Sequence, residues 1–168
     1  MRGARTDASG TQVTKDDRLI ASNKRAYHDY FVEETFEAGI ALTGTEVKSL
    51  RQHGAQMRDS FAVIRRSEAW LHGVHISPYS HGNRANVDPD RIRKLLLHAK
   101  QIRYLGAKTK ERGYTLVPLR IYFNERNIAK LELGLCRGKH TYDKRDSIAK
   151  RDQERDVQRA LRERQKGE

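Results

Sequence analysis

Alternation of hydrophobic and polar residues predicts several β-strands in the middle of the chain. Residues 27–36 are rich in aromatic and β-branched side chains, and residues 39–42 prolong this strand after a bulge or bend expected at Gly39. Residues 61–64 and 70–76 have a similar composition and predict two more strands. The main expected element of the fold is therefore a sheet.

The clearest alternation lies in the second half of the sequence. Apolar residues occupy every second position over 115–123 and again over 129–135, and a turn at 124–127 separates the two runs. This spacing predicts a β-hairpin. Pro118 lies inside the first run and has no N–H to donate, so we expect it at a sheet edge or at a bulge.

Two helices are expected between these strands. Thr43 followed by Glu46 matches a capping box, and Gly54 is a suitable end, so these residues predict a short helix. A longer helix is expected to open at residues 88–90 and to stop before Gly113, because apolar residues follow at helical spacing. Its apolar positions are Ile92, Leu95, Leu96, Ala99 and Ile102.

The pattern as a whole predicts a mainly β fold with attached helices. At least five strands around one core favour a small OB-fold-like barrel, although an open α+β sheet would show the same pattern. Composition divides the chain into three parts. These are a flexible N-terminal leader over residues 1–22, a body with most of the bulky apolar residues over 23–136, and a flexible basic tail over 137–168.

Charge narrows the range of functions. The 168 residues include 34 Lys and Arg but 22 Asp and Glu, which gives a formal net charge of +12. Such an excess favours a polyanionic partner, most commonly nucleic acid. The sequence has no apolar run long enough to span a membrane, and its single cysteine, Cys136, cannot form an internal disulfide. These features predict a cytoplasmic protein with no membrane partner.

Motifs for catalysis are weak. Glu33, Glu34 and Glu37 lie close in sequence and leave a metal-dependent RNA hydrolase open, but on a strand Glu34 points away from the other two. The seven histidines have no spacing that completes a zinc site, and Cys136 has no activating neighbour in the sequence. We therefore expect no enzyme activity, no metal and no cofactor.

Cations close to aromatic residues are better candidates for a site. Unpaired RNA bases need flat rings or guanidinium groups to stack on, and phosphates need cations. Residues 23–30 offer both, and the two predicted helices add further Lys and Arg. The RNA-binding candidates that follow from this pattern are Asn23, Lys24, Arg25, His28, Tyr30, Lys48, Arg51 and Lys94.

The tail is polar throughout. Good helix formers fill it from Asp146 onward, yet Val157 and Leu161 are almost its only apolar stripe. A helix of this kind cannot recover its ordering entropy by packing on the body. We expect the tail to be disordered alone and to become helical on a highly charged partner.

Three blocks of the sequence resemble the SsrA-binding proteins, the SmpB family. The first is HDYFVEETFEAG at 28–39, which runs on to LTGTEVKSLR at 42–51. The second is RKLLLH at 93–98, and the third is GK at 138–139 followed by DKR at 143–145. The first block is long enough to make the resemblance specific.

The resemblance implies an OB-fold barrel with attached helices and a tail that is unstructured in isolation. It implies a non-enzymatic adaptor that binds the tRNA-like domain of transfer-messenger RNA and delivers it to stalled ribosomes for trans-translation. The tail would occupy the empty decoding centre and message channel, where it becomes helical. The implied partners are transfer-messenger RNA, the small ribosomal subunit and ribosomal RNA.

Residue roles can be carried over by position from this family. RNA binding falls on Asn23, Lys24, Arg25, His28, Glu37 and Leu96. Contact with the decoding site falls on the third block, at Lys139, Tyr142, Asp143, Lys144 and Arg145. We expect Glu37 to accept hydrogen bonds from base amino groups or to orient a cation, and Tyr142 to stack on a ribosomal RNA base.

Two positions depart from the family pattern. His140 stands where a second Lys is common, and the turn at 124–127 lacks the usual glycine. Neither position lies in the first two blocks. The alternative within binding proteins is another OB-fold translation or ribosome-assembly factor.

Overall fold

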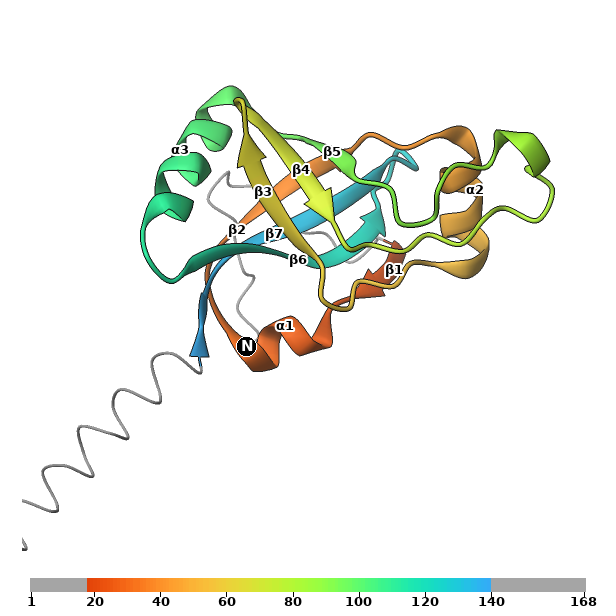
Figure 1. Cartoon of the computed structure of the whole chain (residues 1–168). Coiled ribbons are helices and arrows are strands. Elements are labelled where there is room, and N and C mark those ends of the chain that lie inside the picture. The colour runs from red at the N-terminus through yellow and green to blue at the C-terminus, as the bar shows by residue number, and fades with distance from the viewer. Residues whose placement is uncertain (1–17, 140–168) are drawn as a thin grey trace, which may run out of the picture.

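The computed structural model describes residues 18–139, and expectations for residues 1–17 and 140–168 lie outside this range. The strands are β1 (Arg18–Ser22), β2 (Tyr30–Ile40), β3 (Phe61–Arg65), β4 (Glu68–His72), β5 (Arg93–Leu96), β6 (Tyr114–Phe123) and β7 (Ala129–Gly138). The helices are α1 (Lys24–Asp29), α2 (Gly44–His53) and α3 (Ala99–Lys110), with one 3-10 turn at Asn83–Ala85. Figure 1 shows their arrangement.

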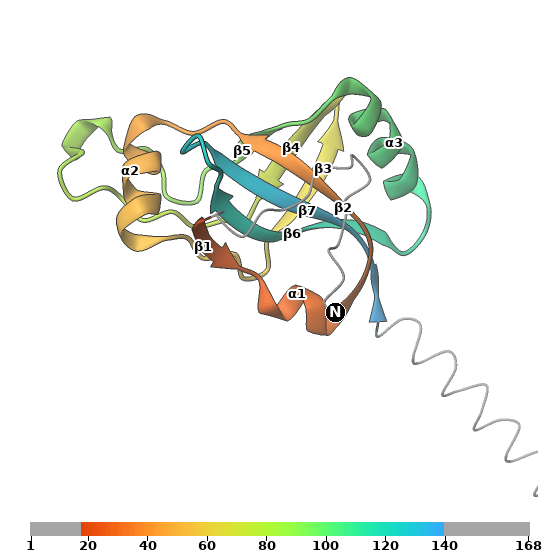
Figure 2. The same cartoon turned by 180° about the vertical axis from the view of Figure 1, so that it is seen from behind.

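The strands form a closed antiparallel sheet. Their order around it is β6, β3, β4, β5, β2 and β7, and β7 pairs with β6 to complete the circuit, while β1 also pairs with β6. Strands β3 and β4 face the viewer in Figure 1, and β2 and β7 face the viewer in Figure 2. Buried leucines such as Leu116, Leu131 and Leu135 form the core. The prediction of a mainly β fold is confirmed.

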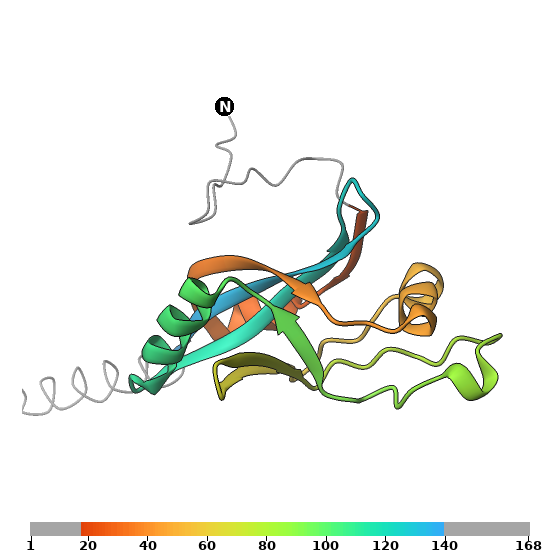
Figure 3. The same ribbon diagram turned by 90° about the horizontal axis from the view of Figure 1, so that it is seen from above.

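The three helices lie around this sheet. Helices α2 and α3 lie at opposite ends of the molecule, as Figures 1 and 3 show from two directions. The capping box predicted for α2 is present, because Thr43 Oγ1 accepts the Glu46 N–H and the Glu46 carboxylate accepts the Thr43 N–H. Gly54 ends the helix with a φ of 71°. Within residues 18–139 no helix has the length and hydropathy that crossing a membrane requires.

The predicted hairpin is confirmed by β6 and β7. These strands pair from Tyr114 opposite Arg137 to Phe123 opposite Ala129. Their register shifts between Pro118 and Arg120, so the bulge expected at Pro118 is present. A proline fits here because it has no ladder N–H to lose.

The first long strand differs from its prediction. Residues 27–29 belong to α1, so β2 begins at Tyr30. The register of β2 against β7 shifts between Val32 and Glu34, not at Gly39. Gly39 instead marks a close approach of two strands: a Cβ there would lie 3.2 Å from the Cβ of Leu96 on β5, which is a tight contact.

The predicted long helix from residues 88–90 is wrong in its first half. Residues 93–96 form strand β5, and α3 begins only at Ala99. In β5 the side chains of Arg93 and Leu95 are buried, which is the two-residue period of a strand. The strand predicted over 70–76 also ends early, at His72, since Gly73 turns the chain with a φ of 76°.

The expected boundaries of the body shift at both ends. Residues 18–22 were assigned to a flexible leader, but they form β1 and pair with β6. Strand β7 continues to Gly138, two residues beyond the expected end of the body at 136. Both extensions add hydrogen bonds to the β6–β7 hairpin, which the apolar pattern alone does not reveal.

Candidate nucleic-acid interface

Helix α1 carries most of the predicted RNA-binding residues. It forms because Asn23 caps it: Asn23 Oδ1 accepts the Ala26 N–H at 3.2 Å. Asn23 Nδ2 donates to the Pro118 carbonyl at 3.1 Å, and its backbone N–H donates to the Leu119 carbonyl at 2.7 Å. Asn23 is buried, and both its side-chain oxygen and its side-chain nitrogen have hydrogen-bond partners. We therefore expect it to support RNA binding by holding α1 on β6 rather than by direct contact.

Replacing Asn23 with Ala should lower the free energy of unfolding by about 1–2 kcal/mol, because the cap and the bond to Pro118 are both lost. Chemical denaturation measures this change. Asn23→Ser is the matched control, since Ser keeps a cap acceptor without placing a negative charge against the Pro118 carbonyl. An Asn23→Ala variant as stable as the parent would contradict the capping role.

The exposed side of α1 presents cations and a histidine. Arg25 Nε lies 3.1 Å from Asp29, and Arg25 Nη1 lies 3.4 Å from Asp59. His28 Nδ1 lies 2.9 Å from Asp29. The hydrogen bond from His28, followed by that from Arg25, lowers the pKa of Asp29. Lys24 is exposed beside them. Arg25 and His28 thus pair with carboxylates at the surface, and both side chains stay exposed to solvent.

The end of β7 is joined to α1. Lys139 Nζ donates to the Tyr27 carbonyl at 3.1 Å and lies 5.1 Å from the centre of the Phe31 ring. This bond satisfies a carbonyl in the last turn of α1. Lys139 was predicted to contact the decoding site, and sequence reasoning did not foresee its bond to α1. Lys139, the last described residue, therefore lies beside α1.

Strands β2 and β5 hold three further candidates. Glu37 accepts a hydrogen bond from the Tyr122 hydroxyl and lies 3.7 Å from Lys130 Nζ. The expectation that Glu37 orients a cation is consistent with the Lys130 contact. Leu96 is exposed and lies opposite Gly39 of β2. Tyr30 is half-buried and packs against the small apolar cluster under α1.

The remaining cationic candidates are not near α1. Lys48 Nζ lies 5.6 Å from the centre of the Tyr79 ring, and Arg51 lies 5.4 Å from that of Phe123. Both belong to α2, which the views place apart from α1 (Figures 1 and 2). Lys94 on β5 pairs with Glu68. The structure thus separates the α1 group, Lys24, Arg25 and His28, from Glu37 and Leu96 toward the other end of β2 and from the cations of α2.

Four predicted tail residues cannot be placed. Tyr142, Asp143, Lys144 and Arg145 lie outside the described residues. Their assignment to the decoding site stays a prediction.

The acidic cluster does not converge as a hydrolase would require. Glu33 lies 3.3 Å from Arg137, whereas Glu34 accepts a hydrogen bond from the Tyr104 hydroxyl. That bond raises the pKa of Tyr104 to about 12. Within residues 18–139 no three His, Cys, Asp or Glu side chains gather as a metal site would need. The three glutamates each have a different partner, so they serve as contacts between elements.

Cys136 is also unsuited to nucleophilic chemistry. Its side chain is buried, and burial raises the pKa of the thiol to about 12. A thiol of this kind remains protonated at neutral pH, whereas a nucleophilic cysteine needs the thiolate.

A buried ionic network beside α2 was missed by sequence reasoning. Glu46 accepts hydrogen bonds from Arg91 Nη2 at 2.6 Å and from Arg93 Nε at 2.9 Å. Arg93 is 1% exposed and donates further bonds to the Val74 and Pro89 carbonyls. Burial by itself would raise the pKa of Glu46, but the bonds from both arginines and the Thr43 N–H lower it. The network joins α2 to β5 and to the segment that precedes it.

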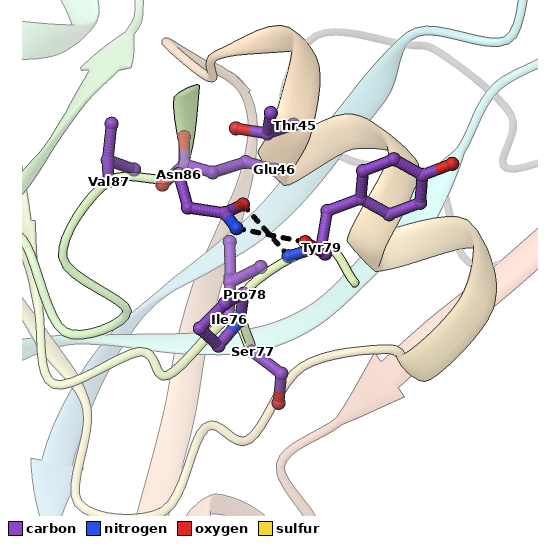
Figure 4. A pocket seen from close by; sticks show the side chains of 8 residues that line it. All are labelled: Thr45, Glu46, Ile76, Ser77, Pro78, Tyr79, Asn86 and Val87. Atoms are coloured by element: carbon purple, nitrogen blue, oxygen red, sulfur yellow. Dashed lines mark hydrogen bonds between the residues drawn. The ribbon is translucent and has the colours of Figure 1, made fainter. Parts of the chain in front are cut away.

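The loop after β4 is held next to this network. Asn86 exchanges two hydrogen bonds with the backbone of Tyr79, at 3.0 and 2.9 Å. Figure 4 shows this pair at a shallow hollow beside the start of α2, where Thr45 and Glu46 also lie. The two bonds close the loop on itself. They stabilise the surface from which Tyr79 meets Lys48.

Comparison with known proteins identifies the family. The family model described as "SmpB protein" matches residues 20–163. The SsrA-binding protein of Moorella thermoacetica is 57% identical over 149 residues, which cover 89% of this chain and 96% of the relative. That of Lacticaseibacillus casei is 57% identical over 150 residues, which cover 89% and 95%.

Structural similarity to a solved structure supports the same family assignment. That structure is described as "tmRNA-SmpB: a journey to the center of the bacterial ribosome". One of its chains is 55% identical to this chain, with a TM-score of 0.61, and the match covers 72% of this chain and 85% of that one. The chain described above therefore belongs to the SmpB family of SsrA-binding proteins.

Proposed function

We propose that this protein binds transfer-messenger RNA and carries it to stalled ribosomes for trans-translation. The observation that carries the proposal is the 57% identity to an SsrA-binding protein along 89% of the chain. The net charge of +12 fits a polyanionic partner. As a member of this family the chain is an RNA-binding protein and not an enzyme.

The closed sheet is best interpreted as an OB-type barrel with additions. Barrels of this type bind nucleic acid on their strand faces and loops. Here the six strands of the circuit form the barrel, and β1 with the three helices are additions to it. This topology supports a body that recognises folded RNA.

We propose that the surface for the transfer-messenger RNA runs from α1 along β2 to β5. The RNA would reach from Lys24, Arg25 and His28 on α1 to Glu37 further along β2 and to Leu96, which lies opposite Gly39 near the end of that strand. The α1 cations meet phosphates, and Glu37 accepts from base amino groups or holds Lys130 toward the RNA. The α2 group, Lys48 and Arg51, makes a lesser contribution from elsewhere on the molecule.

We propose that the body and the tail of the chain have different roles. Residues 23–136 hold the RNA, and residues 137–168 enter the decoding centre and message channel of the small subunit, where they become helical. Because Lys139 is bonded to α1, the tail leaves the body close to the bound RNA. We propose no role for residues 1–17.

Binding to transfer-messenger RNA is the direct experiment. The full chain and transcribed transfer-messenger RNA are titrated over a range of salt, with an unrelated messenger RNA fragment as competitor. About five loop phosphate contacts would give a log–log slope near −3.5. A flat salt dependence, or equal affinity for the competitor, would count against the proposal.

Replacing Tyr142 with Ala should weaken tagging of nascent chains on stalled ribosomes and leave transfer-messenger RNA binding intact. The reason is that Tyr142 is proposed to stack on a ribosomal RNA base, not on the RNA that the body holds. Tagging in a reconstituted translation system and RNA affinity are measured on the same preparation. Tyr142→Phe, which keeps the ring, is the control. Loss of both activities would refute the division between body and tail.

A further inference from the structure

The outer face of strands β3, β4 and β5 carries one exposed aromatic ring, Phe61, beside the half-buried Val63 and Trp70. Side chains alternate along each strand, so Ala62, Leu71 and Leu95 are buried in the core. Their neighbours point outward in cross-strand pairs, with Phe61 opposite His72 and Val63 opposite Trp70. We call this outward group the outer strand face: Phe61, Val63, Trp70, His72 and Lys94.

One pair on the outer strand face forms a flat platform. The rings of Phe61 and His72 are 5.0 Å apart between centres, and their planes differ by 2°. Phe61 is nonetheless 43% exposed, so much of its ring faces solvent. A stacked pair that already has one covered side and one open side offers a ready surface for a third flat group.

The platform lies close to the cations of α1. Asp59, two residues before Phe61, lies 3.4 Å from Arg25 Nη1 and 3.7 Å from Arg58 Nε. Arg25 belongs to the helix that is proposed to meet transfer-messenger RNA. Figure 1 shows the start of β3 on the side of the molecule where α1 lies. A nucleic acid that lies along α1 can therefore reach Phe61.

Charge around the platform fits an anionic partner. Arg25 and Arg58 both pair with Asp59, next to the start of β3 where Phe61 lies, whereas Arg65 and Arg66 lie at the other end of that strand. An exposed aromatic ring among cations is the combination with which proteins bind unpaired nucleotides, because the ring stacks on the base while the cations meet the phosphates. A purely apolar protein partner would leave these cations without anionic groups to meet.

We infer that the Phe61–His72 pair stacks on an unpaired base of the transfer-messenger RNA held by α1. The inference rests on the proposed function and extends the RNA surface from α1 onto the outer strand face. Phe61 supplies the exposed ring, and His72 supports it from behind. The sequence analysis did not assign either residue to the RNA-binding set, because a Phe and a His eleven positions apart carry no common signal until β3 and β4 pair them.

The test distinguishes the effect of the aromatic ring of Phe61 from the effect of an apolar side chain of similar size. Phe61→Leu keeps bulk without a ring, and Phe61→Tyr keeps the ring. Ile128→Ala is the matched control, since Ile128 is 51% exposed and lies next to the β6–β7 turn. Each full-length variant is titrated with transfer-messenger RNA and, separately, with ribosomes, and thermal unfolding confirms that each is folded.

Phe61→Leu is expected to weaken transfer-messenger RNA binding by about tenfold without changing the salt slope, because stacking releases no counterions. Phe61→Tyr and Ile128→Ala should bind within about twofold of the parent. Unchanged binding by Phe61→Leu overturns the inference while leaving the proposed function in place. A loss confined to ribosomes also overturns it and assigns the platform to ribosomal RNA. A parent chain that fails to bind transfer-messenger RNA refutes the proposed function, and the inference with it.

Discussion

Replacing Glu46 with Gln should lower the free energy of unfolding by about 3 kcal/mol. Glu46 is the shared acceptor of Arg91 and Arg93, and Arg93 is 1% exposed. Without the carboxylate a guanidinium remains buried with no counter-charge, which costs more than an ordinary lost hydrogen bond. Chemical denaturation at pH 7 measures the change.

The same carboxylate should make the fold sensitive to acid. The network lowers the pKa of Glu46 from its ordinary value of 4.5. The unfolded chain therefore binds this proton at a higher pH than the folded chain does. The stabilisation by Glu46 is complete above the unfolded value and is lost as the pH falls through the folded value. Denaturation curves between pH 6 and about pH 3 should show the loss in the parent and a smaller loss in Glu46→Gln.

An exposed ion pair provides the control for this prediction. Glu68 pairs with Lys94 on the surface of β4 and β5, so Glu68→Gln should change stability by less than about 1 kcal/mol. If Glu46→Gln were no more destabilising than Glu68→Gln, the network would not be what holds α2 against β5.

Reversing the charges of α1, Lys24→Glu with Arg25→Glu, should strongly reduce affinity for transfer-messenger RNA. Two phosphate contacts become repulsive, so the log–log slope of affinity against salt should fall by about 1.4 to 1.8 in magnitude. Filter binding at several salt concentrations gives both quantities. The fold should remain, because both side chains are exposed and Asn23 still caps the helix.

The α2 cations form the matched control for α1. Lys48→Glu with Arg51→Glu makes the same change in net charge at a different place on the molecule. We expect a smaller loss of affinity from this variant, since only the long-range attraction is reduced. Equal losses from both variants would mean that net charge, and not the surface at α1, governs binding.

Local pattern was enough to predict the elements whose partners are close in sequence. The β6–β7 hairpin and its bulge follow from alternation and from Pro118, and α2 follows from Thr43 and Glu46. The error at β5 arose from Arg93. A charged residue off the apolar stripe of a helix is expected to face solvent, whereas Glu46 with the Val74 and Pro89 carbonyls allows Arg93 to be buried in a strand.

The sequence was enough to propose which residues bind RNA, but not to predict how these residues are arranged in space. Resemblance to a family placed Lys24, Arg25 and His28 in the RNA-binding set, and the structure gathers them on one helix. It could not reveal α1 itself, a helix of six residues that depends on carbonyls of β6 for its cap. The resemblance also could not show that the α2 cations lie apart from the α1 residues, because this separation depends on the closed sheet between the two helices.

The most direct test of the central claim is to recover the RNA that the full chain holds in cells. The protein is cross-linked, purified under denaturing conditions, and its RNA is sequenced. The account predicts one dominant species, the transfer-messenger RNA, with cross-linked nucleotides in its tRNA-like domain. A broad mixture of messages, or ribosomal RNA without transfer-messenger RNA, would contradict it.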